Sequence, residues 1–217
     1  MEVPMKRPSK SYTIALIAAL MTLVLSAAVA VPLLWRGFYY LHIAGLSLPE
    51  KTGWTAVEIR AAFDEMMNYC VFRQPFGTGV LKWSAEGAAH FADCELLFRL
   101  DFTLLAVSLA AVLLLWSMGR EFAAVPFGNR GPLFWSGSIL AGLFALIGGL
   151  GAVDFDRTFV IFHSLFFPGK SNWIFDWRVD EIILVLPQVV FRNYAILIVC
   201  LLLAGCVGLM CLDRKTK

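Results

Sequence analysis

Charged residues are scarce in this sequence of 217 residues, because Asp, Glu, Lys and Arg together account for only 16% of it. A soluble domain carries about 25% charged residues. Hydrophobic residues make up 59% of the chain, and its mean hydropathy is +0.75. This composition excludes a disordered chain and an ordinary cytosolic enzyme, and it is typical of a membrane protein with several spans and modest loops.

Motifs for several kinds of chemistry are also missing. The five cysteines form no CxxC pair, the usual sign of a metal site. No serine or cysteine nucleophile motif is evident, and the net charge of +2 includes no basic stripe with interleaved aromatics. We therefore expect no metal, no cofactor and no nucleic-acid partner.

Four long apolar runs dominate what is present, and we place the membrane spans at 12–34, 102–118, 133–153 and 194–212. About 20 apolar residues suffice for a helix to cross the bilayer. Backbone inside a bilayer must satisfy its own hydrogen bonds, so all four runs predict helices. A cleaved signal peptide is the alternative for the first run, but its length of 23 residues exceeds the 7–15 of a signal peptide core.

The distribution of charge predicts the orientation. The N-terminal tail, the loop 119–132 and the C-terminal tail hold eight of the 18 basic residues, and the loops 35–101 and 154–193 hold 13 of the 16 acidic ones. Positive charge favours the cytoplasmic side. We therefore expect both termini in the cytoplasm, and a single domain over 1–217 whose long loops form a small helical and loop cap on the extracytoplasmic side.

The loop 35–101 contains two helix starts. The sequence Thr55-Ala-Val-Glu58 matches a capping box and is followed by apolar residues at helical spacing up to Cys70. Ser84 is a second candidate N-cap, from which a helix would run unbroken into the second span. In the other loop, the run 182–191 is too short to span and is broken by Pro187, which favours a re-entrant or interfacial segment.

Polar residues on the helix that begins near Ser84 are the first candidates for function. They share one face at helical spacing, and comprise Glu86, His90, Asp93 and Asp101. A polar stripe that descends toward lipid is costly unless it is paired or lines a wet cavity. His163, in the other outer loop, lies among aromatic residues and also close to carboxylates. Cys70 and Cys94 would both face outward, where a disulfide between them is an open alternative to two free thiols.

Two stretches resemble a known family. The first is 83–98, with the sequence WSAEGAAHFADCELLF; the second is 162–167, with FHSLFF, followed by Trp173, Asp176, Asp180 and Pro187. Together with four spans, they resemble the four-span bacterial membrane proteins that include the lipoprotein intramolecular transacylase. Cys94 departs from the more hydrophobic residue of some members.

The resemblance implies an acyl shift on a bacterial lipoprotein. The substrate would be an N-terminal cysteine that carries a diacylglyceryl group, embedded in membrane lipid at the bacterial cell membrane. The sn-2 acyl chain would move to the α-amino group and leave a lyso-form lipoprotein. The two outer histidines of the family correspond by motif to His90 and His163.

Histidine chemistry suits such a reaction, because its pKa near 6.5 allows it to take a proton from an α-amino group of pKa about 7.7–8. We interpret His163 as the base and His90 as the hydrogen-bond donor, with Asp93 fixing the tautomer of His90. Arg157 and Arg73 are candidates for binding the ester, while Trp173 and Asp176 complete the expected substrate site.

Two other interpretations remain open from the sequence. His90, Asp93 and His163 could instead hold zinc in a metal-dependent membrane lipid hydrolase, since a catalytic zinc needs three protein ligands. The chain could also be a non-enzymatic lipid-binding scaffold, in which neither histidine would matter for the product.

Overall fold

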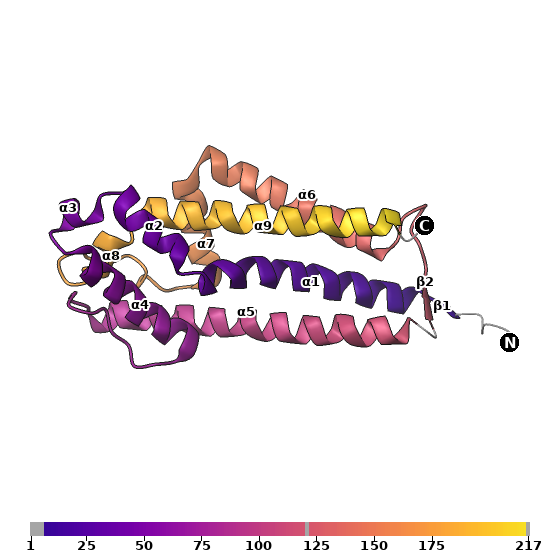
Figure 1. Cartoon of the computed structure of the whole chain (residues 1–217), viewed down its shortest axis with the longest axis horizontal. Coiled ribbons are helices and arrows are strands. Elements are labelled where there is room, and N and C mark those ends of the chain that lie inside the picture. Colours follow the sequence, from indigo (N-terminus) through magenta and orange to yellow (C-terminus); the bar gives the residue numbers. More distant parts are fainter. Residues whose placement is uncertain (1–6, 120–121, 216–217) are drawn as a thin grey trace. The chain divides into compact units, whose positions relative to one another are not determined.

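The computed structural model describes residues 7–119 and 122–215. Within them, four helices are long and apolar enough to cross a membrane (Figure 1): α1 (Lys10–Leu34), α5 (Ala85–Met118), α6 (Pro132–Val153) and α9 (Gln188–Lys215). Each contains one of the predicted apolar runs. The prediction of an all-α membrane protein with four spanning helices is therefore confirmed.

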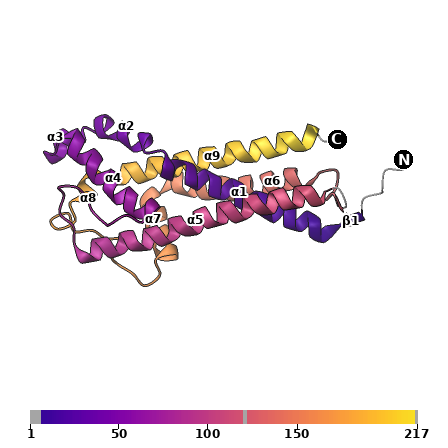
Figure 2. The same cartoon turned by 60° about the horizontal axis from the view of Figure 1, so that its bottom comes forward.

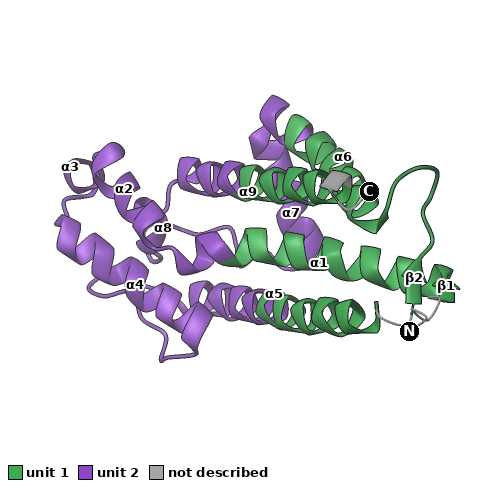
Figure 3. Ribbon diagram, turned by 45° about the vertical axis from the view of Figure 1, so that its right-hand side comes forward, with its two compact units in different colours: residues 1–30, 101–149, 198–217 green, residues 31–100, 150–197 purple. Residues whose placement is uncertain are grey.

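The chain divides into two compact units, which Figure 3 shows in different colours. Unit 1 comprises residues 1–30, 101–149 and 198–217, and unit 2 comprises residues 31–100 and 150–197. All four spanning helices contribute to both units. The expectation of a single domain stays a prediction.

Unit 1 consists of spanning helices that approach closely at small residues. A Cβ on Gly137 of α6 would lie 2.5 Å from the carbonyl oxygen of Cys206 on α9, and one on Gly205 would lie 2.9 Å from Val24 on α1. Small residues allow this close packing where no hydrophobic effect drives helices together. The Tyr12 hydroxyl donates to the carbonyl of Leu115 at 3.0 Å and so joins α1 to α5.

A short parallel strand pair, which the sequence did not predict, also belongs to unit 1. Strand β1 (Arg7–Ser9) pairs with β2 (Phe122–Ala124), with Pro8 opposite Ala123. Both strands lie outside the apolar runs.

Unit 2 contains the short helices of the predicted cap: α2 (Gly37–Gly45), α3 (Leu48–Thr52), α4 (Ala56–Phe72) and α8 (Ile182–Val185). The predicted capping box starts α4, because Thr55 Oγ1 accepts from the Glu58 N–H at 3.2 Å and Glu58 Oε2 accepts from the Thr55 N–H at 2.7 Å. The predicted apolar face of α4 is buried, including Ile59, Phe63 and Cys70.

The side chain of Tyr39 on α2 contacts both α4 and α8. The Tyr39 ring of α2 stacks on Phe63 of α4 with ring centroids 3.8 Å apart, and its hydroxyl donates to the Val185 carbonyl of α8 at 2.8 Å. Figures 1 and 2 both show α4 alongside the first part of α5, where the Cys70 thiol donates to the Phe91 carbonyl at 3.8 Å.

Two elements of unit 2 differ from the sequence-based expectation. The run 182–191 is not one segment: α8 is a single turn, Pro187 follows it, and α9 already begins at Gln188. The loop 154–193 also contains an unpredicted helix, α7 (Phe155–Phe166), whose N-cap Asp154 accepts from the Arg157 N–H at 2.9 Å. The polar cap before residues with helical apolar spacing was the available signal for α7.

Candidate active site

The candidate site lies within unit 2, at the beginning of α5, and a buried carboxylate fixes its position. Asp180 is 4% exposed and accepts hydrogen bonds from the Ser84 N–H and hydroxyl, both at 2.8 Å. Ser84 is the predicted N-cap, since its hydroxyl accepts from the Gly87 N–H at 2.9 Å. The segment 167–181 is therefore tied to the first turn of α5.

Gly87 is required for this attachment. A Cβ at this position would lie 2.2 Å from Asp180 Oδ1 and 3.2 Å from Phe175. Since real Cβ atoms do not come so close to other atoms, only glycine allows the segment to approach α5 at this turn.

The two predicted histidines meet one turn further along α5. His90 on α5 and His163 on α7 have ring centroids 6.0 Å apart, with 30° between their planes. Both residues are buried, with 6% and 7% of their surfaces exposed. Side chains 73 positions apart in the sequence thus converge, as the interpretation of the two outer motifs required.

The surroundings of His163 determine which nitrogen carries its proton. Its Nδ1 lies 2.8 Å from the Phe159 carbonyl oxygen, which can only accept, so Nδ1 carries the proton and Nε2 has the lone pair. Phe159 and Trp173 lie against the ring, with centroids 4.1 and 4.5 Å away. Burial lowers the pKa of His163 below its usual 6.5, and the hydrogen bond to Phe159 only partly opposes this effect. His163 is therefore neutral at pH 7.

His90 has the complementary arrangement. Cys94 Sγ lies 3.5 Å from its Nε2, one helical turn away, while Nδ1 is buried without a hydrogen-bond partner among the described residues. In the tautomer in which the Cys94 thiol donates to Nε2, Nδ1 carries a proton that nothing accepts. Phe167 and Phe175 pack edge-on against the ring, with centroids 5.0 and 5.5 Å away.

Asp93 does not orient His90, contrary to our hypothesis. Its carboxylate instead accepts from Lys170 Nζ through Oδ1 and from Asn172 Nδ2 through Oδ2, the latter at 3.2 Å. The spacing on α5 placed Asp93 near His90, but one cation and one amide from the segment 167–181, Lys170 and Asn172, donate to its carboxylate instead. Asp93 therefore ties this segment to α5, as Asp180 does.

The remaining predicted site residues divide into two groups. Trp173 packs against His163, and its expected role in substrate binding stays a prediction. Arg73 forms an ion pair with Glu95, Asp176 forms one with Arg178 two residues later, and Arg157 is exposed. None of these contacts involves a histidine. The proposed role of these three residues in substrate binding stays a prediction. Sequence reasoning missed Lys170 and Asn172, whose only signal was their position between the second histidine motif, 162–167, and Trp173.

The structure also bears on the thiols and on metal binding. Cys70 and Cys94 are free thiols, so the disulfide alternative does not hold in this structure. Among residues 7–119 and 122–215, no group of three or more His, Cys, Asp and Glu side chains could hold a metal ion. The ligand set of the zinc hydrolase interpretation is therefore not assembled there, because the carboxylate of Asp93 is bound elsewhere.

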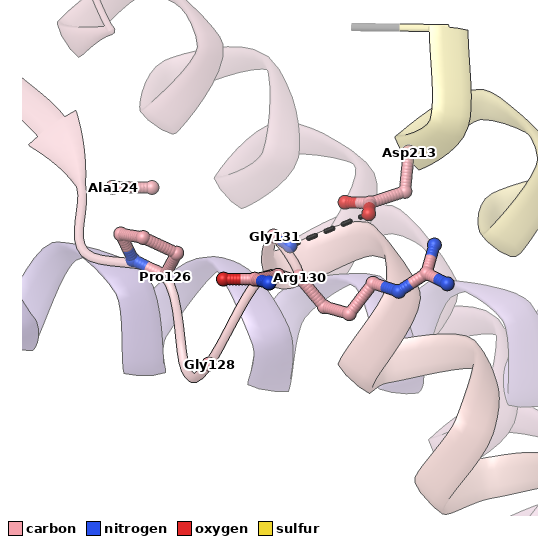
Figure 4. Close-up of a pocket in the computed structure, with 7 residues that line it drawn as sticks. Ala124, Pro126, Gly128, Arg130, Gly131 and Asp213 are labelled. Carbon is pink, nitrogen blue, oxygen red and sulfur yellow. Dashed lines mark hydrogen bonds between the residues drawn. The ribbon is translucent and has the colours of Figure 1, made fainter. Parts of the chain in front are cut away.

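Unit 1 has a cavity of its own. It measures about 570 Å³ and is lined by Ala124, Pro126, residues 128–131 and Asp213, which accepts from the Gly131 N–H at 3.3 Å (Figure 4). Neither histidine lines it. The two histidines and the polar side chains around them thus all belong to unit 2.

A family profile described as "Lipoprotein intramolecular transacylase Lit" matches residues 13–191. The chain belongs to the lipoprotein intramolecular transacylase family. It is accordingly an acyltransferase that moves an acyl chain within a lipoprotein, as the resemblance of the two outer motifs implied. A search of curated protein sequences finds no match.

Solved structures show the same fold. The membrane-integral lipoprotein intramolecular transacylase Lit from Bacillus cereus is 23% identical to this chain, with a TM-score of 0.83 and 94% of each chain covered. Two variants of that protein, in which a histidine is replaced by arginine or alanine, are 20% identical, with TM-scores of 0.78. They cover 94% of this chain and 90% and 91% of their own. Because these structures cover 94% of this chain, the shared fold includes both units.

Proposed function

We propose that this chain transfers the sn-2 acyl chain of an N-terminal diacylglyceryl-cysteine to the α-amino group of the same cysteine. The pairing of two buried imidazoles, 6.0 Å apart and on separate elements, carries the proposal. In this reaction the amine nitrogen bonds to the ester carbonyl carbon, the bond from that carbon to the glyceryl oxygen breaks, and one proton moves from nitrogen to oxygen.

His163 acts as the general base in this proposal. Its Nε2 has the lone pair, since Nδ1 donates to Phe159, and its lowered pKa keeps the ring neutral at pH 7. Nε2 takes the proton from the attacking amine and returns it to the departing glyceryl oxygen. No nucleophilic side chain is needed, because amine and ester belong to one molecule and orientation alone supplies up to about 7–11 kcal/mol.

His90 donates from Nδ1 to the oxygen of the ester carbonyl as negative charge develops there. The support is its buried Nδ1 without a partner, together with the thiol of Cys94 at Nε2. A donor that is already in place inside a dry site stabilises an oxyanion far better than one in water.

The lipid part of the substrate has an apolar surface available next to the histidines. Large apolar side chains are exposed on α7 and the following segment, including Ile161, Phe162, Leu165 and Trp177. His163 is buried on the same helix, so acyl chains held along α7 would present their ester close to the base. Membrane lipid and the diacylglyceryl group are the partners that fit this surface.

Tandem mass spectrometry of lipoprotein N-termini tests the function. In a host without its own N-acylation, the chain should convert diacylglyceryl-cysteine into an isomer of unchanged mass, because intramolecular transfer adds and removes no atoms. Fragmentation should reveal an N-acyl cysteine and a glyceryl group with one remaining ester.

The same spectra distinguish the alternatives. Loss of one acyl group, with a hydrogen atom from water in its place on the glyceryl oxygen and release of the free fatty acid, would indicate a lipid hydrolase. A parent ion heavier by one acyl chain would indicate transfer from another molecule. An unrearranged N-terminus, in cells that accumulate the protein, would indicate a scaffold and contradict the proposal.

We further propose that both termini are cytoplasmic and that the histidines lie at the outer leaflet. The support is the positive charge of the tails and of the loop 119–132. Part of it, Lys6, Arg120 and Lys217, lies outside the described residues. The acidic balance of the loops 35–101 and 154–193 agrees with the same orientation.

Cysteine labelling in intact cells tests this orientation. In a variant without native cysteines, Val80→Cys should react with a membrane-impermeant maleimide before lysis, because Val80 is 64% exposed in unit 2. Phe127→Cys, 45% exposed in the loop 119–132, is the matched control and should react only after lysis. The opposite pattern would reverse the topology.

A further inference from the structure

The amide of Asn172, which is bound to Asp93 on α5, is left with an unused acceptor. Its Oδ1 is buried and has no hydrogen-bond partner among the described residues, as is also true of His90 Nδ1. A buried carbonyl without a partner costs about as much as a lost hydrogen bond. An acceptor of this kind indicates a donor that the chain itself does not supply.

The orientation of the amide is fixed by chemistry. Asn172 Nδ2 lies 3.2 Å from Asp93 Oδ2, and only the NH₂ group can donate to a carboxylate. Oδ1 therefore points away from Asp93. Donation to a carboxylate polarises the amide and makes its oxygen a better acceptor.

Asn172 is also in the right place to act on the substrate. It is adjacent in the chain to Trp173, whose ring lies 4.5 Å from that of His163, and it is bound to Asp93, three residues after His90 on α5. Lys170, on the same carboxylate, balances the charge of Asp93. The cluster thus holds a polarised neutral oxygen on the segment that packs against the proposed base through Trp173 and that is tied to the helix of the proposed oxyanion donor through Asp93.

We infer that Asn172 Oδ1 accepts a hydrogen bond from the α-amino group of the lipoprotein substrate. This inference rests on the proposed function, in which that amine is the nucleophile. The hydrogen bond holds one N–H of the amine while His163 Nε2 takes another proton, so the nitrogen lone pair that forms the new bond is turned toward the ester. Asn172 is then the residue that recognises the amine of the substrate.

Binding of two unreactive probes tests this recognition. Both are dialkylglyceryl-cysteinyl peptides in which ethers replace the two esters, and one of them lacks the α-amino group. The native enzyme should bind the amine probe at pH 7 about 10-fold more tightly, because a charged donor is lost with the amine. Asn172→Ala should bind both probes equally, with the affinity of the native enzyme for the probe without an amine.

Matched variants separate recognition from folding. Asn68→Ala removes an amide that binds Arg36 away from the histidines, at 2.6 Å, and should keep the 10-fold preference. The double variant D93N/N172D exchanges donor and acceptor, so it keeps the link between the two positions as well as an oxygen for the amine, and should restore the preference. It also provides the test if Asn172→Ala fails to fold.

Two results would overturn the inference. One is a preference for the amine probe that survives in Asn172→Ala; the other is a folded D93N/N172D variant without that preference. Formation of N-acyl product by the native enzyme, measured in parallel, reports on the proposed function separately, because it can succeed while the preference for the amine fails.

Discussion

Replacement of His163 by alanine should lower the turnover number for transacylation by about 10²–10⁴-fold, the usual contribution of a general base. The proposed base is the lone pair on Nε2, which is available because Nδ1 donates to Phe159. The alanine variant lacks this atom, so it has no base to take the proton of the amine. The measurement is the fraction of N-acyl cysteine over time, from fragmentation spectra, at equal amounts of folded enzyme in detergent or lipid.

The third histidine of the chain provides the control for this variant. His42 is also buried and its Nδ1 also donates to a carbonyl four residues earlier, that of Phe38, at 2.8 Å. Its Nε2 lies 2.9 Å from Asn193 and it contacts neither proposed catalytic ring. His42→Ala should therefore keep the native turnover. Equal losses in both variants would indicate damaged folding, and native turnover in His163→Ala would remove His163 from catalysis.

The dependence of the native turnover on pH follows from the lowered pKa of His163. The neutral form is the active one, so turnover should rise with pH, with a midpoint below 6.5, as the ring loses its proton. The substrate amine adds a second rise near its own pKa of about 7.7–8. His163→Ala should lose the first rise and keep the second, and a first rise with its midpoint above 6.5 in the native enzyme would contradict this assignment.

Replacement of His90 by alanine should lower the turnover number by about 10²–10³-fold, as expected when one oxyanion donor is removed. The donor in question is Nδ1, the buried atom without a partner in the described structure. His90→Asn, which keeps an N–H donor, should lose less. The same product assay measures both variants, with His42→Ala again as the control.

The two histidines should differ in their effect on the pH profile. His90→Ala should keep the rise below pH 6.5, since His163 remains, although the maximum is lower. If this rise instead disappears in His90→Ala and persists in His163→Ala, His90 is the base and His163 is the donor.

The elements that the sequence predicted correctly depend on neighbours along the chain. The four apolar runs identify spanning helices because a bilayer requires about 20 apolar residues per span. Thr55 and Ser84 mark the starts of α4 and α5 because a side chain there satisfies backbone N–H groups three residues away. Packing is not needed to recognise such features.

Asp93 shows where this kind of reasoning stops. Helical spacing puts Asp93 one turn from His90, and from this we predicted a hydrogen bond between them. The hydrogen bonds of Asp93 instead go to Lys170 and Asn172. These partners are 77 and 79 positions away, and a carboxylate takes the strongest donors within reach. Cys94, next in the sequence, lies near the ring instead.

By itself the sequence determined that this chain is a four-span membrane protein, and it singled out two histidines outside the apolar runs, because span length, capping and helical spacing are local properties. Only the tertiary structure decided which atoms face each other: the 6.0 Å pairing of the imidazoles, the tie of Asp93 to the segment 167–181, and the unused oxygen of Asn172. These depend on contacts between segments far apart in the chain, which are selected by packing and by competition among hydrogen-bond donors rather than by sequence spacing.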